Sequence, residues 1–162
     1  MSHREKSTTQ DEIEGEALML YACCTAIATL AAVSLYQAGK IQSLPDPPSR
    51  IFASERITSS KAAHPLGIPD GLLGLASYGM TLALIGLSHR NKAYRRALGA
   101  KLVLDAGAAT INSGRQIIRF RQLCSWCTGT ALATGVMVCA GRRLIVDSLA
   151  CLWRSSLARA RS

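Results

Sequence analysis

Cys124 and Cys127 are the residues whose type and spacing point most directly to chemistry. Two cysteines separated by two residues can form a disulfide and exchange it with another dithiol. At the start of a helix, unpaired backbone N–H groups and the helix dipole favour the thiolate of the first cysteine. The second cysteine then lies one turn deeper, beside the flat apolar wall of Trp126. This placement predicts that Cys124 faces an aqueous dithiol and Cys127 faces a lipophilic electron carrier; the alternative is that both are packing residues of an alanine-rich helix.

The other cysteines fit simpler roles. Cys23 and Cys24 are adjacent on a helix and point about 100° apart, so they make a poor disulfide pair. We expect these two and Cys139 to act as small apolar residues, and Cys151 to be a thiol on the reducing side. No second cysteine or histidine pair accompanies Cys124 and Cys127, so the sequence predicts no metal site.

The elements that position the cysteine pair are long apolar runs. Residues 17–39, 71–88 and 123–141 carry no charge, and each run is close to the roughly 20 residues that cross a bilayer as a helix. The first 16 residues are polar and acidic, unlike a secretory signal. The first run, 17–39, is therefore predicted to be an uncleaved membrane span. The second and fourth spans are predicted over residues 68–88 and 121–141.

A third span is predicted over residues 97–118, although this segment contains Lys101, Asp105 and Arg115. Lys101 and Asp105 are four residues apart and can pair on one helix face. The pair is interpreted either as structural or as a proton-handling site. The fold prediction is all-α, an integral membrane four-helix bundle over residues 17–141. A polar cytoplasmic segment, 1–16, precedes it, and a basic amphipathic tail, 142–162, follows.

The charge distribution predicts the topology. The net charge is +9, but the basic residues flank apolar runs, which argues against nucleic-acid binding and for orientation by the positive-inside rule. The dense connector 90–96 and the arginine-rich tail place both termini in the cytoplasm and the loop 40–65 outside. Three arginines in the expected outer turn oppose this assignment: Arg115, Arg119 and Arg121. The tail is expected to lie on anionic membrane lipids.

Several residues resemble a known family. The segment Cys124-Ser-Trp-Cys127-Thr-Gly-Thr-Ala131 is similar to the fourth-helix active site of the vitamin K epoxide reductase family. Ser59-Ser60, followed by Leu66-Gly-Ile-Pro-Asp-Gly-Leu-Leu-Gly74, is similar to that family's path from the outer loop into its second helix. The resemblance covers about residues 17–141 and includes the order of four helices.

The resemblance implies that Cys124 and Cys127 are catalytic and reduce a quinone, with Cys127 facing it. Ser59, Ser60 and Trp126 would line the quinone site, with Ser60 as the preferred hydrogen-bond donor. The alternative role for Ser60 is an ordinary helix cap. In the family, a second cysteine pair in the outer loop relays electrons from a thioredoxin-like partner.

This chain departs from the family in the loop 40–65, which contains no cysteine. The family's second loop cysteine falls on Ser54, and the first falls near Asp46. Serine cannot exchange disulfides, so a separate thioredoxin-like protein or a small dithiol would have to reach Cys124 directly. The leading interpretation is a thiol–quinone oxidoreductase in a bacterial-type inner or plasma membrane. The alternatives are a non-catalytic relative that binds a quinone or a partner helix, and a transporter or assembly factor.

Overall fold

The chain is helical along most of its length. The computed structural model describes residues 3–159, with side chains for 13–65, 67–151, 153 and 154. Its elements are α1 (His3–Gln37), α2 (Ser54–Thr58), the short 3-10 turns η1 (Lys61–Ala63) and η2 (Pro65–Gly67), α3 (Asp70–Leu87), α4 (Lys92–Phe120), α5 (Ser125–Ala140) and α6 (Arg142–Arg159). Helix accounts for 79% of the chain and the described residues contain no strand, which confirms the all-α prediction.

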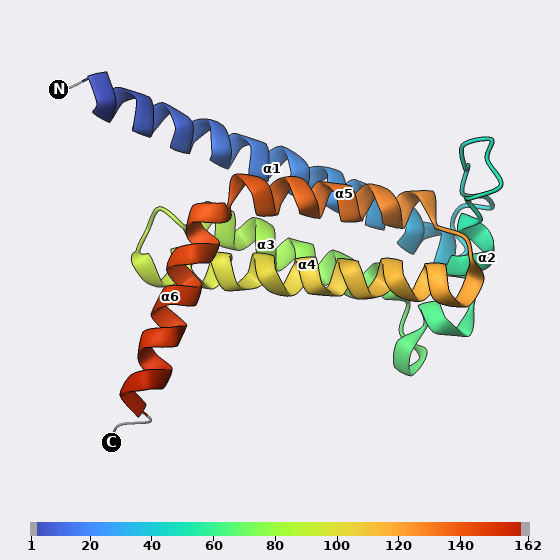
Figure 1. Cartoon of the computed structure of the whole chain (residues 1–162). Coiled ribbons are helices and arrows are strands. Elements are labelled where there is room, and N and C mark those ends of the chain that lie inside the picture. The colour runs from blue at the N-terminus through green and yellow to red at the C-terminus, as the bar shows by residue number, and fades with distance from the viewer. Residues whose placement is uncertain (1–2, 160–162) are drawn as a thin grey trace.

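Four long helices lie side by side. α1 packs against α3 and α5, and α4 packs against the same two helices (Figure 1). The loop that carries α2 lies at one end of this arrangement, and the α3–α4 turn lies at the other. Between the helices is one buried cluster, formed by Met19, Ala22, Cys23, Ala26, Leu30, Tyr78, Ile85, Leu98, Leu102, Ala133 and Met137.

Local signals explain most of the helix ends. Asn91 caps α4, because its side-chain oxygen accepts hydrogen bonds from the backbone N–H groups of Ala93 and Tyr94 at 2.8 and 3.1 Å. α3 begins directly after Pro69. α4 ends at Phe120, and the next residue, Arg121, adopts a left-handed conformation with φ of 52°. The expected fourth span, 121–141, therefore starts too early, because α5 begins only at Ser125.

The helices differ in their suitability for crossing a membrane. Among the described residues, α1 from Ile13 and α3 are long and apolar enough to cross. α5 and α6 form a third candidate only if they are counted as one broken span, because their axes differ by 71°. α4, with Lys101 and Asp105, is not a candidate by these criteria. The structure thus contains two or three candidate spans, and the predicted four-helix membrane bundle is not confirmed.

α6 leaves the direction of α5 and packs against α4. The contact is close at Gly99, where a Cβ atom would overlap the backbone of Leu144 and the hydroxyl of Ser148. That hydroxyl donates a hydrogen bond to the carbonyl oxygen of Arg96 at 2.9 Å. The described part of the expected tail, Arg142–Arg159, is therefore a helix that docks on α4 at Gly99, and residues 160–162 lie outside the described residues.

Gly99→Ala is expected to lower the free energy of unfolding by about 1–3 kcal/mol, because the new methyl group meets backbone that cannot move aside. Thermal unfolding of the purified protein in detergent would measure the loss. Gly107→Ala is the matched control on the same helix, since a Cβ there meets nothing within 4 Å; it should be neutral or slightly stabilising. Equal melting temperatures for the two variants would contradict the close α4–α6 contact.

Candidate functional site

Cys124 sits at the junction between α4 and α5. Its sulfur accepts a hydrogen bond from the backbone N–H of Cys127 at 3.2 Å, so Cys124 is the N-cap of α5. The backbone N–H of Cys124 donates to the side-chain oxygen of Gln116 at 2.9 Å. The expected placement of the pair at a helix start is therefore present. Each of the six cysteines in this structure is a reduced thiol, so the disulfide between Cys124 and Cys127 stays a prediction.

Backbone hydrogen bonds join the loop 40–65 to this junction. The backbone N–H of Leu123 donates to the carbonyl oxygen of Ile51 at 2.8 Å, and that of Ala53 donates to the carbonyl oxygen of Leu123 at 2.9 Å. These bonds form the isolated bridge between Phe52 and Leu123. Chain segments far apart in the sequence are thus joined directly beside Cys124.

A polar network, formed by Asp46, Ser54 and Ser125, strengthens this closure. The Asp46 carboxylate accepts hydrogen bonds from the backbone N–H of Ser54 at 2.7 Å, from its hydroxyl at 2.5 Å and from the Ser125 hydroxyl at 2.6 Å. The backbone N–H of Ser125 donates to the Ser54 hydroxyl at 2.9 Å. Burial opposes ionisation of Asp46, but the bonds from Ser125 and Ser54 outweigh it and lower the pKa of the carboxyl.

The loop buries the thiol that was expected to meet solvent. Cys124 is 0% exposed, as is Ser54. The direct access required for an external dithiol is therefore missing in this conformation. The side chain of Cys127, together with Ser54, holds the pKa of the Cys124 thiol below its ordinary value despite burial. A nucleophilic thiol is thus kept under a closed loop.

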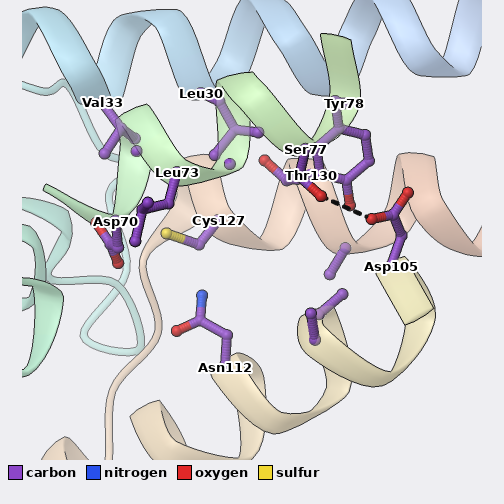
Figure 2. Close-up of a pocket in the computed structure, with 15 residues that line it drawn as sticks. Leu30, Val33, Asp70, Leu73, Ser77, Tyr78, Asp105, Asn112, Cys127 and Thr130 are labelled. Carbon is purple, nitrogen blue, oxygen red and sulfur yellow. Dashed lines mark hydrogen bonds between the residues drawn. The ribbon is translucent and has the colours of Figure 1, made fainter. Parts of the chain in front are cut away.

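Cys127 opens into a cavity instead of being fully shielded. The cavity has a volume of about 340 Å³ and is lined by residues of α1, α3, α4 and α5 (Figure 2). Its apolar lining includes Leu30, Val33, Leu73, Ala108, Ala109 and Ala131. The polar lining is limited to Asp70, Ser77, Tyr78, Asp105, Asn112 and Thr130. A mostly apolar cavity with a few polar groups has the character of a small-molecule site.

Two polar residues flank the sulfur of Cys127. In Figure 2 the amide nitrogen of Asn112 points toward Cys127 from α4, and Asp70 lies on the opposite side at the start of α3. Gln37 holds Asp70 in place by donating to its carboxylate at 2.7 Å and to the carbonyl oxygen of Thr58 at 3.1 Å. The side-chain oxygen of Gln37 also accepts from the backbone N–H of Gly71 at 3.2 Å. Asp70 is thus fixed by α1 and the loop together.

The other end of the cavity contains the predicted ion pair. Lys101 contacts the Asp105 carboxylate, and their side chains are only 12% and 4% exposed. Asp105 also accepts hydrogen bonds from Ser77 at 3.0 Å and Thr81 at 2.7 Å. Lys101 donates to the same two hydroxyls at 2.9 and 3.1 Å. The pairing is confirmed, and its location is the interface of α3 with α4.

The other residues expected at the site lie elsewhere. Ser60 donates to the carbonyl oxygen of Ile57 at 2.7 Å, and Ser59 is 3.3 Å from the hydroxyl of Tyr36. The indole nitrogen of Trp126 donates to the carbonyl oxygen of Pro45 at 3.2 Å. In this closed conformation, Cys127 is the one member of the expected quinone-contacting set that lines the cavity.

Sequence reasoning missed Asn112, a polar residue with no motif around it. One signal was available, since residues 105, 108, 109 and 112 share one face of a helix. All four line the cavity. Within the described part of the chain, no group of three histidine, cysteine, aspartate or glutamate side chains could hold a metal ion.

Comparison with known proteins agrees with the geometry around the cysteine pair. The vitamin K epoxide reductase family matches residues 17–140. This span contains both Cys124 and Cys127 and every residue that lines the cavity. No curated protein and no solved structure matches the chain. The family match covers more than half of the sequence, and the chain therefore belongs to the vitamin K epoxide reductase family.

Proposed function

We propose that this protein is a membrane thiol–quinone oxidoreductase that uses Cys124 and Cys127 to pass electrons from an extracytoplasmic dithiol to a quinone. The family is membrane-embedded, and its members are generally oxidoreductases that use quinones. One observation carries the proposal for this chain: Cys127 opens into a mostly apolar cavity of about 340 Å³, while its partner Cys124 lies one helical turn away.

The proposed reaction has two half-reactions. An external dithiol reduces the Cys124–Cys127 disulfide and becomes a disulfide itself, attacking at Cys124. The two thiols of the protein then lose two electrons and two protons to the quinone, which leaves as a quinol, and the protein disulfide reforms. Electrons and protons balance without any further cofactor.

The cavity supplies the quinone contacts. We assign the amide of Asn112 as the hydrogen-bond donor to a quinone oxygen, because it faces Cys127 across the cavity. The earlier candidates Ser59, Ser60 and Trp126 bond to the loop or to α1 in the closed conformation. Their contact with the quinone is proposed only for a conformation in which the loop has moved.

Reduction of the protein requires the loop to open. Cys124 is 0% exposed beneath Asp46 and Ser54, and the loop has no cysteine to carry electrons to it. The electron donor is therefore a separate thioredoxin-like protein or a small dithiol that gains access when this network breaks. We place the site on the outer side of a bacterial-type membrane, with four crossings and both termini cytoplasmic. In this topology α4 is the crossing whose Lys101 and Asp105 face α3.

The test is quinone reduction by purified protein, with dithiothreitol as donor and a short-chain ubiquinone as acceptor. Cys124→Ser and Cys127→Ser should each lower the rate at least about 100-fold, since either change removes the dithiol. Cys139→Ser is the matched control, because this exposed cysteine lies on the same helix away from the cavity. Turnover that survives Cys127→Ser would overturn the proposal.

A second measurement tests the quinone contact. Asn112→Ala should raise KM for the quinone about 10-fold, the loss expected for one hydrogen bond to a bound ligand. Ser113→Ala is the control, because Ser113 is the next residue on α4 and does not line the cavity. If both variants have the wild-type KM, the quinone does not bind beside Asn112.

The burial of Cys124 favours one alternative, a non-catalytic relative that binds a quinone or a partner helix. The variant Cys127→Ser distinguishes an oxidoreductase from this non-catalytic alternative, because Cys124 could then form a mixed disulfide that no second cysteine resolves. An oxidoreductase should accumulate a covalent adduct with an extracytoplasmic dithiol protein in its own cell. Quinone binding without turnover and without an adduct would favour the alternative.

A further inference from the structure

A second hollow lies at the end of the molecule remote from Cys124. It has a volume of about 640 Å³ and is formed by the start of α4 and the side of α6. We call it the α4–α6 groove and define it by Lys92, Arg95, Arg96, Leu144, Asp147 and Arg154. The quinone proposal makes no use of it.

The groove is strongly basic. Four of its side chains are cationic and one, Asp147, is anionic. Arg95 also lines the neighbouring cavity, which contains Arg142, Arg143 and one acidic side chain, Glu16. The four cationic side chains are exposed and accessible to a ligand, and arginine presents paired donors that fit a phosphate group.

The walls of the groove are held in fixed positions. Gly99 permits close contact between α4 and Leu144, and the Ser148 hydroxyl bonds to the carbonyl oxygen of Arg96. The contact between α4 and α6 therefore keeps the basic residues at the start of α4 and Arg154 on α6 around the same hollow. This distinguishes the groove from a set of unrelated surface charges.

Apolar surface lies beside the charges. Val146, Leu149 and Trp153 on α6 are 64%, 50% and 69% exposed. α4, which forms one wall of the groove, begins shortly after α3, one of the two helices that are apolar enough to cross a membrane. A ligand that suits this position has a phosphate for the arginines and hydrocarbon for the exposed face of α6.

We propose that the α4–α6 groove binds the headgroup phosphate of an anionic phospholipid. The lipid's phosphate lies between Arg95 and Arg154, and its acyl chains lie along the apolar face of α6. The site is more specific than a general attraction of a basic tail to a charged surface, because two helices contribute to it and a defined contact holds them together.

The experiment measures lipid binding to the delipidated full chain by native mass spectrometry. Dioleoylphosphatidylglycerol is the anionic probe. Dioleoylphosphatidylcholine, whose choline cation cancels the charge of its phosphate, is the zwitterionic comparison, and inorganic phosphate is a separate competitor. Arg95→Gln/Arg154→Gln should weaken phosphatidylglycerol binding roughly 30-fold, about fivefold for each basic residue near a phosphate. The conservative pair Arg95→Lys/Arg154→Lys should retain most of the binding, which shows that the helices still form the groove.

Lys40→Gln/Arg50→Gln is the matched control, because it removes the same charge from exposed positions of the outer loop. It should bind the lipid as the wild type does. An equal loss in this control would show only general charge attraction and overturn the site. Equal binding of phosphatidylcholine would overturn it as well, and so would complete displacement by inorganic phosphate, which would identify a site for the free ion. Because quinone reduction is not the readout, failure here leaves the proposed function untouched.

Discussion

Lys101→Met is expected to lower the free energy of unfolding by about 3–5 kcal/mol, the usual cost of removing one partner from a buried ion pair. Asp105 is 4% exposed and accepts bonds from Lys101, Ser77 and Thr81. Without the lysine, the carboxylate keeps two hydroxyl donors but loses the only cation bonded to it among the described residues. Thermal unfolding in detergent should show a large fall in melting temperature or loss of folded protein.

The double variant Lys101→Met/Asp105→Leu separates the charge from the packing. It removes both ions and fills the space with apolar atoms, so it should recover most of the stability lost in Lys101→Met. If the double variant is no more stable than the single one, the loss reflects the packing around Lys101, and the isolated carboxylate is not its cause.

Ser54→Cys, made in a Cys127→Ser background, is expected to form a disulfide with Cys124 in most molecules after mild oxidation. The hydroxyl of Ser54 accepts a hydrogen bond from the backbone N–H of Ser125 at 2.9 Å. Since Ser125 follows Cys124 directly, a sulfur at position 54 is expected to lie within reach of the Cys124 thiol. Mass mapping of the alkylated, digested protein would identify the linked peptides.

Ser59→Cys in the same background is the control. Ser59 is exposed and bonds to Tyr36 instead of the cysteine junction, so little linkage to Cys124 is expected. Linkage at position 59 instead of position 54 would show that the loop lies differently.

The helices were predictable where apolar runs and caps mark them. Residues 71–88 and 123–141 approximate α3 and α5, and Asn91 is an ordinary helix cap. The α4–α5 turn was placed too early, because the predicted spans ended at 118 and resumed at 121, whereas α4 ends at Phe120 and α5 begins at Ser125. The reason is Arg121, which adopts a left-handed conformation although no glycine or proline marks the turn.

The redox pair was predictable from spacing, but its surroundings were not. The closure over Cys124 depends on Asp46, Ser54 and Ser125, whose bonds connect segments more than 70 residues apart in sequence. Pattern analysis within one segment cannot detect such contacts. The cavity raises the same difficulty, because Asn112 becomes informative only when α4 is known to lie opposite Cys127.

The Asp46 network also limits how often the reactive thiol is available. Two hydrogen bonds of this network join the loop to α5, from the Ser125 hydroxyl to Asp46 and from the Ser125 backbone N–H to Ser54. At about 1 kcal/mol each they bias the closed state by about 2 kcal/mol. Only about 3% of molecules would then be open at any moment, and a small thiol that waits for this opening would react about 30-fold more slowly than with an exposed cysteine. A protein partner that binds the open loop would escape this limit. Selectivity between thiols would thus arise from the resting population of the loop, before any contact with Cys124 is made.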